Sequence, residues 1–242
     1  MKMSSKTSAV GLCWYIMCKK RNVEIAATLL GADIFALEET LSLLRRHKIE
    51  WLHIDVMDGH YVPNLALSPA FCRAVAAKSG MPLDIHLMVE NADKFIELFG
   101  TFQGSRLTFH PETTRQPVRT IERIRALGCF PGIALDPGVS VETWRHLLPL
   151  VDHVLVMTVN PGYSAQKLLP FCIEKIAQCR QALDACGSEA YVEVDGNVSW
   201  SNLPAILAAG ADLLVGGSAV ILEKGRTSAA KIKRMRQACQ RK

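Results

Sequence analysis

Residues 51–89, WLHIDVMDGHYVPNLALSPAFCRAVAAKSGMPLDIHLMV, place two short runs rich in Val, Ile and Leu on either side of a longer amphipathic stretch. The runs at 51–57 and 83–89 are predicted strands, and the stretch at 69–79 is a predicted helix. A strand, a helix and a second strand in this order form a unit whose two strands lie parallel. The segment therefore predicts a βαβ unit.

The same alternation continues along the chain in both directions. Further strands are predicted at 23–30, 106–110, 131–136, 153–159, 190–196 and 212–218. Further helices are predicted at 35–47, 91–99, 116–127, 141–150, 169–185, 201–209 and 227–238. Eight strand–helix units in one chain of 242 residues predict an α/β fold, a single (β/α)8 TIM barrel. An open doubly wound sheet fits less well, because the turn after the first strand, LLGADIF, lacks the glycine fingerprint of that fold.

We expect the barrel domain to span residues 23–242 and residues 1–22 to be a non-catalytic N-terminal extension. Within that extension the apolar run AVGLCWYIMC is too short to span a bilayer, and basic residues follow it where a signal peptide would have its cleavage site. A targeting or surface role for residues 1–22 stays open.

Composition excludes several classes of protein. Hydrophobic residues make up 49% of the chain, which is enough for a buried core and argues against disorder. The net charge is +5, but the basic C-terminal stretch KIKRMRQACQRK has no interleaved aromatic residues for stacking on bases. The eight cysteines form no C-x-x-C pair and read as reduced, mostly buried thiols. We expect a cytoplasmic protein that binds neither nucleic acid nor membrane.

Polar residues alternate with apolar ones along three predicted strands. Side chains at positions i and i+2 share one face of a strand, so the apolar neighbours face the helices. The residues on the polar faces are His53, Asp55 and Met57; Asp84, His86 and Met88; and Tyr191, Glu193 and Asp195. Burying several such groups is costly unless they are paired or bind a metal, so we expect a divalent-metal site rather than separate hydrogen-bonded interior side chains.

Two carboxylates beside a metal can invert one carbon centre. A metal that coordinates a carbonyl oxygen and the neighbouring hydroxyl oxygen of a substrate acidifies the C–H bond of the carbon that carries the hydroxyl. The metal also stabilises the enediolate that forms when this proton is removed. Asp55 and Asp195 come from distant strands, so one can remove the proton and the other can return one on the opposite face. This chemistry requires no organic cofactor.

Three glycine-containing turns predict a phosphate site beside these carboxylates. They lie at 160–166, 196–197 and 216–218, after predicted strands of the barrel. Backbone N–H groups after the seventh and eighth strands of such barrels often bind phosphate.

The chain resembles the ribulose-phosphate 3-epimerase family over residues 24–221. The resemblance rests on HIDVMDGHYVPN (53–64), DIHLMVENAD (84–93), VLVMTVNPG (154–162), EVDG (193–196) and GADLLVGGSA (210–219), with weaker support at 108–113 and 132–138. It implies the ribulose-phosphate-binding type of TIM barrel and a divalent metal such as Zn, Fe(II), Mn or Co. It further implies an isomerase of the pentose phosphate pathway.

The resemblance assigns a role to individual residues. Metal ligands would be His53, Asp55, His86 and Asp195, and Asp55 and Asp195 would be the acid/base pair. Met57, Met88 and Met157 would line the enediolate, although methionine also fills gaps in any core. Phosphate and sugar contacts would come from Thr28, His86, Gly162, Tyr163, Ser164, Ala165, Gly196, Asn197, Gly217 and Ser218.

Three departures from the family pattern affect the substrate side of the site. Ala27-Thr28 replaces a proline-serine pair, with a hydroxyl retained. Ser164-Ala165 replaces a glycine pair, and Asn197 replaces the second glycine after the seventh-strand Asp. The HPET and LSP segments resemble those of relatives that act on D-allulose 6-phosphate.

The sequence favours C3 epimerisation of D-ribulose 5-phosphate to D-xylulose 5-phosphate by a homo-oligomer. Two alternatives stay open: the same chemistry on D-allulose 6-phosphate, and a non-catalytic sugar-phosphate-binding barrel. A barrel decarboxylase with an Asp-Lys-Asp array is disfavoured, because HIDVMDG has no lysine. His110 and Glu112 are interpreted as a structural hydrogen-bonded pair, with an outer role beside the site as the alternative, and His60 and Tyr61 could frame the pocket.

Overall fold

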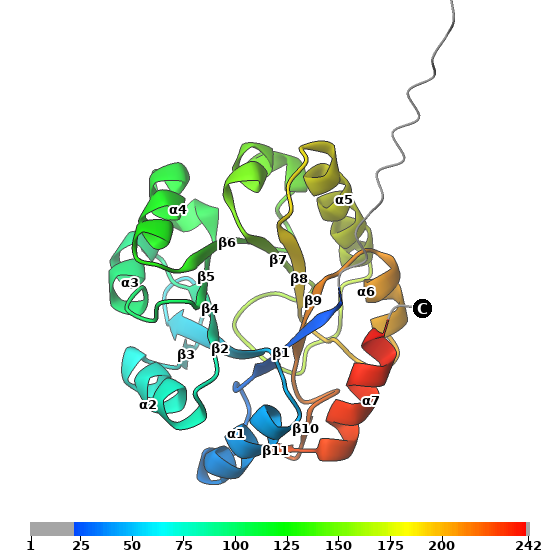
Figure 1. Ribbon diagram of the computed structural model, residues 1–242. Coiled ribbons are helices and arrows are strands. Elements are labelled where there is room, and N and C mark those ends of the chain that lie inside the picture. Colours follow the sequence, from blue (N-terminus) through cyan, green and yellow to red (C-terminus); the bar gives the residue numbers. More distant parts are fainter. Residues whose placement is uncertain (1–21, 241–242) are drawn as a thin grey trace, which may run out of the picture.

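The computed structural model describes residues 22–240, and these residues form a closed barrel of eight parallel strands (Figure 1). The barrel strands are β1 (Glu24–Thr28), β2 (Trp51–Asp58), β4 (Leu83–Met88), β5 (Arg106–Phe109), β6 (Phe130–Leu135), β7 (His153–Met157), β8 (Tyr191–Asp195) and β9 (Leu213–Gly216). Each pairs with the next, and β9 pairs with β1, which also pairs with β2. The prediction of a single (β/α)8 TIM barrel is confirmed.

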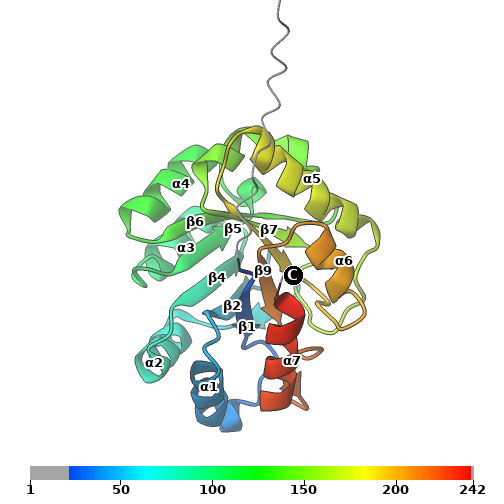
Figure 2. The same ribbon diagram turned by 45° about the vertical axis from the view of Figure 1, so that its right-hand side comes forward.

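Within residues 22–240, seven α-helices surround the strands, and α5, α6 and α7 cover the side formed by the last strands (Figure 2). They are α1 (Leu37–Arg46), α2 (Pro69–Ser79), α3 (Ala92–Phe99), α4 (Pro117–Ala126), α5 (Phe171–Ala185), α6 (Leu203–Ala208) and α7 (Ala229–Cys239). The 3-10 segments are η1 (Ile34–Ala36), η2 (Pro111–Thr113) and η3 (Val141–Leu150). Three two-residue strands, β3 (Leu65–Ala66), β10 (Leu222–Glu223) and β11 (Arg226–Thr227), complete the elements.

The predicted α-helix at 141–150 is wrong in type, because η3 has 3-10 geometry with a kink. Trp144 has non-helical dihedral angles of φ −114° and ψ 20°. Pro149 lies inside the segment and has no amide hydrogen to donate to an earlier carbonyl. The amphipathic pattern was present, but the segment cannot complete a regular α-helix.

Helix α2 shows how local sequence sets the strand–helix units. The Ser68 side chain accepts a hydrogen bond from the Phe71 amide, and Pro69 occupies the first turn, where its missing N–H costs nothing. Gly80 ends the helix at φ 65°, a left-handed conformation that glycine adopts without strain. The chain then turns directly into β4.

The barrel strands are apolar on their outer faces and carry both apolar and polar side chains on their inner faces. Outward-facing side chains join one large core with the helices, and this core includes Ile54, Val56, Ile85, Leu87, Val192 and Val194, as the alternation predicted. A small inner cluster consists of Ala26, Ala134, Leu155, Met157, Leu213 and Val215. Buried polar side chains occupy the remaining interior space of the barrel.

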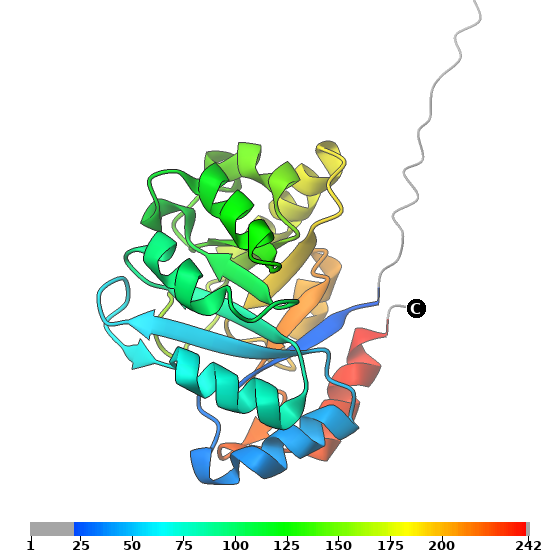
Figure 3. The same cartoon turned by 60° about the vertical axis from the view of Figure 1, so that its left-hand side comes forward.

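The two ends of the barrel differ. In Figure 3, β2 points towards one end, whereas β1 begins and α7 finishes at the other. At that second end the guanidinium of Arg106 lies over the rings of Trp51 and Tyr191, 4.1 and 4.8 Å from their centroids. Its Nη2 donates to Glu24. These side chains close the amino-terminal end, so the site lies at the carboxyl-terminal end.

The remaining sequence predictions concern the cysteines, the membrane and the termini. Six cysteines lie within residues 22–240; all are free thiols and only Cys186 is exposed. None of the helices in this range is long and apolar enough to cross a membrane. The expected extension at residues 1–22 falls, apart from its last residue, outside the described residues, so the domain division remains a prediction.

Candidate active site

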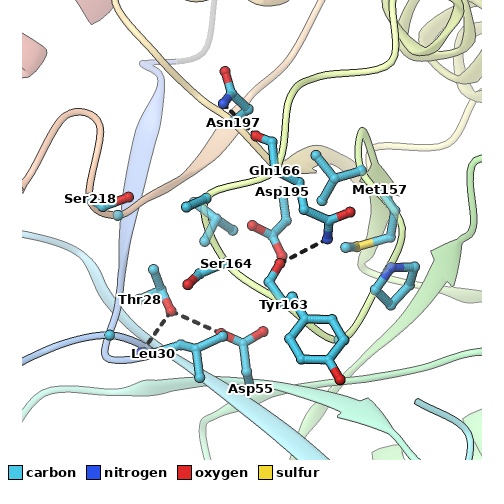
Figure 4. Close-up of a pocket in the computed structure, with 18 of the residues that line it drawn as sticks. Thr28, Leu30, Asp55, Met157, Tyr163, Ser164, Gln166, Asp195, Asn197 and Ser218 are labelled. Atoms are coloured by element: carbon cyan, nitrogen blue, oxygen red, sulfur yellow. Dashed lines mark hydrogen bonds between the residues drawn. The ribbon is translucent and has the colours of Figure 1, made fainter. Parts of the chain in front are cut away.

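A pocket of about 220 Å³ opens at the carboxyl-terminal end of the barrel (Figure 4). Its lining contains almost every residue that the sequence assigned to the substrate. These are Thr28, Asp55, Met57, Met88, Met157, Gly162, Tyr163, Ser164, Ala165, Asp195, Gly196, Asn197, Gly217 and Ser218. His53 and His86 are absent from the lining, because both are fully buried beneath it.

The four predicted metal ligands converge beneath this pocket. One ligand atom from each of His53, Asp55, His86 and Asp195 lies within 4.8 Å of all the others. The Asp55 Oδ1 atom is 3.3 Å from His53 Nε2 and 3.6 Å from His86 Nδ1. The Asp195 Oδ2 atom is 4.0 Å from His53 Nε2.

The two imidazole nitrogens show that this group fits a divalent cation. His53 Nε2 and His86 Nδ1 are buried and have no hydrogen-bond partner. Leaving buried polar atoms unpaired costs about 1–3 kcal/mol each, and native structures keep few of them. Two such nitrogens facing two carboxylates match the ligand preferences of Zn²⁺, Fe²⁺, Mn²⁺ and Co²⁺.

Asp84 fixes the orientation of the first histidine. Its Oδ2 atom is 2.7 Å from His53 Nδ1, so this nitrogen carries the hydrogen and Nε2 presents its lone pair to the site. Burial, followed by the charge of Asp84, raises the pKa of Glu193 well above its ordinary range. Burial therefore favours the neutral form of Glu193 in the barrel interior behind this pair.

The carboxyl groups of Asp55 and Asp195 lie in different environments. Burial alone would raise the pKa of Asp55, but the charge of the neighbouring His53 lowers it well below its ordinary range. Thr28 Oγ1 also donates to Asp55 Oδ2 at 2.9 Å. Burial, followed by repulsion from Asp55, raises the pKa of Asp195 to about 7. Two neighbouring carboxyl groups whose pKa values are shifted in opposite directions are typical of an acid/base pair.

Two polar side chains hold the backbone around the pocket. Thr158 Oγ1 donates to the carbonyl oxygens of Asp195 and Gly196, which ties the end of β8 to that of β7. Thr28 also accepts from the Leu30 amide at 3.1 Å. Each tie fixes the backbone close to one of the two aspartates.

The residues that replace family glycines keep glycine-like backbones. Ala165 has φ +61° and Asn197 has φ +47°, both in the left-handed region. The Asn197 amide donates to the Gln166 carbonyl at 2.6 Å, and Asn202 donates to the Asn197 carbonyl and side-chain oxygens. The side chain at 197 therefore links two loops that glycine would leave unconnected.

The sequence did not predict the role of Gln166 or the hydrogen bonds that join the loop after β7 to the loop after β2 across the pocket mouth. Gln166 Nε2 donates to the carbonyls of Asn160 and Tyr163 and so folds the loop after β7. Tyr163 Oη donates to the Pro63 carbonyl at 2.6 Å, and Asn64 Nδ2 donates to the Gly162 carbonyl at 2.8 Å. The only signal in the sequence was that these polar residues follow predicted strands.

His110 and Glu112 are not an isolated pair. His110 Nε2 lies 2.9 Å from His86 Nε2, and Tyr61 Oη contacts both His110 and Glu112. The interpretation as a structural pair is therefore too narrow, since His110 contacts a candidate metal ligand. Neither His60 nor Tyr61 lines the pocket directly, but Tyr61 packs against Met57 and Met88, which do, so the framing role remains a prediction.

Comparisons with known proteins show which family the chain belongs to. The family model described as "Ribulose-phosphate 3 epimerase family" matches residues 24–221. Ribulose-phosphate 3-epimerase of Treponema pallidum is 41% identical over 200 residues, 83% of this chain and 92% of that protein. Ribulose-phosphate 3-epimerase 1 of Cupriavidus necator is 40% identical over 205 residues, 83% of this chain and 85% of that protein.

Solved structures with lower identity share the fold alone. Phosphoribosyl anthranilate isomerase from Thermus thermophilus has a TM-score of 0.60 at 17% identity and covers 89% of this chain and 97% of its own. A mutant tryptophan synthase alpha-subunit from Pyrococcus furiosus has a TM-score of 0.62 at 10% identity, with 91% and 97% covered. The family match and the curated relatives carry the assignment: the chain belongs to the ribulose-phosphate 3-epimerase family, whose members are isomerases that act on carbohydrates.

Proposed function

We propose that this protein catalyses metal-dependent epimerisation at C3 of D-ribulose 5-phosphate, giving D-xylulose 5-phosphate. The observation that carries the proposal is the pair of unpaired, buried imidazole nitrogens beside two carboxylates at the floor of the pocket. Hydrogen-bonded interior side chains would not leave these nitrogens without partners. Family membership supports the epimerase class and the phosphorylated sugar.

The residues that would hold the cation are His53, Asp55, His86 and Asp195. When bound, a divalent cation supplies positive charge beside two substrate oxygens, which lowers the cost of removing a proton from the carbon between them. The ligand set accepts Zn, Fe(II), Mn or Co, and the reaction requires no organic cofactor.

Asp55 and Asp195 move the protons. Asp55 takes the proton from C3, and Asp195 delivers a proton to the other face of the same carbon, so the configuration inverts. In the reverse direction the two roles exchange. Thr28 holds the Asp55 carboxylate by donating to Oδ2, which keeps its other oxygen towards the histidines.

The methionines and glycine turns would receive the rest of the substrate. Met57, Met88 and Met157 line the pocket and keep water away from the reacting carbon. Backbone N–H groups at 196–197 and 217–218 would bind the phosphate, because no side chain of Gly196 or Gly217 obstructs the approach.

A six-carbon substrate, D-allulose 6-phosphate, is the second candidate. The HPET segment at 110–113 and the LSP segment at 67–69, which resemble those of relatives that act on this sugar, favour it. The side chains of Ser164, Ala165 and Asn197 line the pocket where family members have glycine. These side chains change the space around the sugar and phosphate without touching Asp55. A barrel that binds the sugar phosphate without turnover is the non-catalytic alternative.

We further propose a cytoplasmic homo-oligomer. Cytoplasmic location follows from the reduced thiols that the cysteine pattern predicts. Light scattering of the purified protein measures the assembly, and a mass equal to one chain would refute it.

Product formation from both sugars tests the proposed function. Purified protein loaded with each metal in turn is incubated with either D-ribulose 5-phosphate or D-allulose 6-phosphate, and the C3 epimer is followed by NMR. We expect the pentulose to react faster. A faster hexulose reaction selects the second candidate, and binding of either sugar without any epimer selects the non-catalytic barrel.

A further inference from the structure

A chain of hydrogen bonds leads from the second histidine of the metal group towards the outer edge of the barrel. His86 Nε2 and His110 Nε2 face each other at 2.9 Å, and both side chains are fully buried. Their ring planes are inclined by 30° with centroids 5.1 Å apart. At this distance one of the two nitrogens carries a hydrogen and the other accepts it, because two hydrogens would clash and two lone pairs would repel.

The far side of His110 determines which nitrogen donates. His110 Nδ1 is 2.9 Å from Tyr61 Oη and 3.2 Å from Asp136 Oδ1. Tyr61 Oη is in turn 2.9 Å from Asp136 Oδ2 and 3.0 Å from Glu112 Oε1. Ionised carboxylates only accept hydrogen bonds, so the Tyr61 hydroxyl donates to one of them and its oxygen is free to accept from His110 Nδ1.

In the neutral state of His110, this arrangement gives every hydrogen bond one direction. With its hydrogen on Nδ1, a neutral His110 accepts at Nε2, and His86 must then donate from its own Nε2. His86 Nδ1 is therefore left as a lone pair, 3.6 Å from Asp55 Oδ1 and without a hydrogen-bond partner. This is the tautomer that a metal ligand requires.

We propose that His110 is a positioning residue that holds His86 in its metal-binding tautomer, with Tyr61 as the next link of the relay and the carboxylates of Asp136 and Glu112 as its terminal acceptors. The inference rests on the proposed metal site. It gives the two histidine ligands different supports, since His53 Nδ1 donates directly to the carboxylate of Asp84, whereas His86 Nε2 reaches carboxylates only through a second imidazole.

The position of Asp136 is itself fixed by a buried lysine. Lys175 Nζ of α5 donates to the carbonyl oxygens of Asp136 and Pro137, both at 2.6 Å. These bonds hold the end of β6 against α5 and keep the Asp136 carboxylate beside His110. The Asp136 end of the relay is therefore anchored on a helix, whereas Tyr61 reaches His110 from the loop after β2.

Zinc affinity measured in the absence of substrate is the first test. Competition with a chromophoric chelator is run on wild type, His110→Phe, His110→Gln and Tyr61→Phe, after unfolding curves show that each metal-free protein is folded. Loss of a partner behind a histidine ligand lowers metal affinity about 10–100-fold. We expect that loss in His110→Phe, partial rescue in His110→Gln, which keeps an acceptor, and a smaller loss in Tyr61→Phe. The exposed His146→Gln is the matched control and should not change affinity.

The second test reads the tautomers directly in the wild type and needs no variant to fold. Long-range ¹H–¹⁵N spectra of the zinc-loaded protein distinguish hydrogen on Nδ1 from hydrogen on Nε2, and His86→Gln assigns the signals. We expect hydrogen on Nε2 of His86 and on Nδ1 of His110. A doubly protonated His110, a hydrogen on His86 Nδ1, or unchanged zinc affinity in His110→Phe would each overturn the proposal. A relay with these properties in a protein that epimerises neither sugar would refute the proposed function and leave this inference standing.

Discussion

Replacing Gly196 by Ala tests how strongly the backbone after β8 fixes Asp195. Gly196 has φ +112°, a conformation that residues with a Cβ rarely adopt. An added Cβ would lie 2.8 Å from Thr158 Oγ1, 2.8 Å from Val159 Cγ2 and 2.9 Å from the Val159 amide nitrogen. The amide belongs to the backbone of the chain after β7, so it cannot move aside as a flexible side chain would.

The magnitude follows from these two effects. Backbone strain of this kind costs about 1–3 kcal/mol, and overpacking costs about 1–3 kcal/mol more. We therefore expect Gly196→Ala to lose about 2–6 kcal/mol of unfolding free energy, measured by urea denaturation. If the end of β8 shifts to relieve the contacts, Asp195 moves with it, and a displacement of about 1 Å lowers the epimerisation rate about 100-fold.

Gly80→Ala is the matched control for this experiment. Gly80 also has a left-handed backbone, at φ +65°, but no atom lies within 4 Å of an added Cβ, and it is remote from the pocket. Backbone strain alone should cost about 1–2 kcal/mol and leave the epimerisation rate unchanged. Equal stability and equal rate in the two variants would refute the reasoning.

Three further variants test other contacts. Thr28→Val removes the donor to Asp55, so the epimerisation rate should fall about 10- to 100-fold. Thr28→Ser keeps the hydroxyl and should keep most of the rate. Equal rates in the two variants would count against the role of this hydrogen bond. Ala165→Gly should raise unfolding free energy by about 0.5 kcal/mol, because relief of left-handed strain exceeds the entropy cost of glycine; a loss in urea denaturation would contradict this. Burial, followed by the charge of Arg106, lowers the pKa of His153 to about 3, so its contribution to stability is complete above pH 6.5 and is lost as pH falls towards 3. Metal-free His153→Gln should therefore lose less stability with falling pH, by about 1.4 kcal/mol per unit between pH 6 and 4, and an unchanged slope would refute the assignment.

The sequence predicts the barrel strands and the floor of the pocket because both follow from the two-residue period. Polar residues that alternate with buried apolar ones must share the barrel interior, as His53 and Asp55 do. The short strands β3, β10 and β11 were missed because two residues carry no period. The helix type at 141–150 was missed because the interior proline outweighs the amphipathic pattern.

The partners of the site residues could not be predicted, because they depend on strand register and loop geometry. His86 pairs with Thr108 across β4 and β5, which places His110 one inward-facing position further along. Tyr61 meets His110 only because the loop after β2 folds across the barrel mouth. The two-residue period of a strand predicts which face a side chain occupies, but it does not predict which residue lies beside it on the neighbouring strand.

The reaction of D-ribulose 5-phosphate in D₂O, with metal-loaded wild type and Asp195→Asn side by side, tests the two-carboxylate account most directly. If Asp55 removes the C3 proton and Asp195 supplies the new one, wild type must form D-xylulose 5-phosphate that carries deuterium at C3 from the first turnover. Asp195→Asn must form the product at least about 100-fold more slowly. Product that retains the original hydrogen at C3, or an Asp195→Asn variant that epimerises at the wild-type rate, would contradict the account.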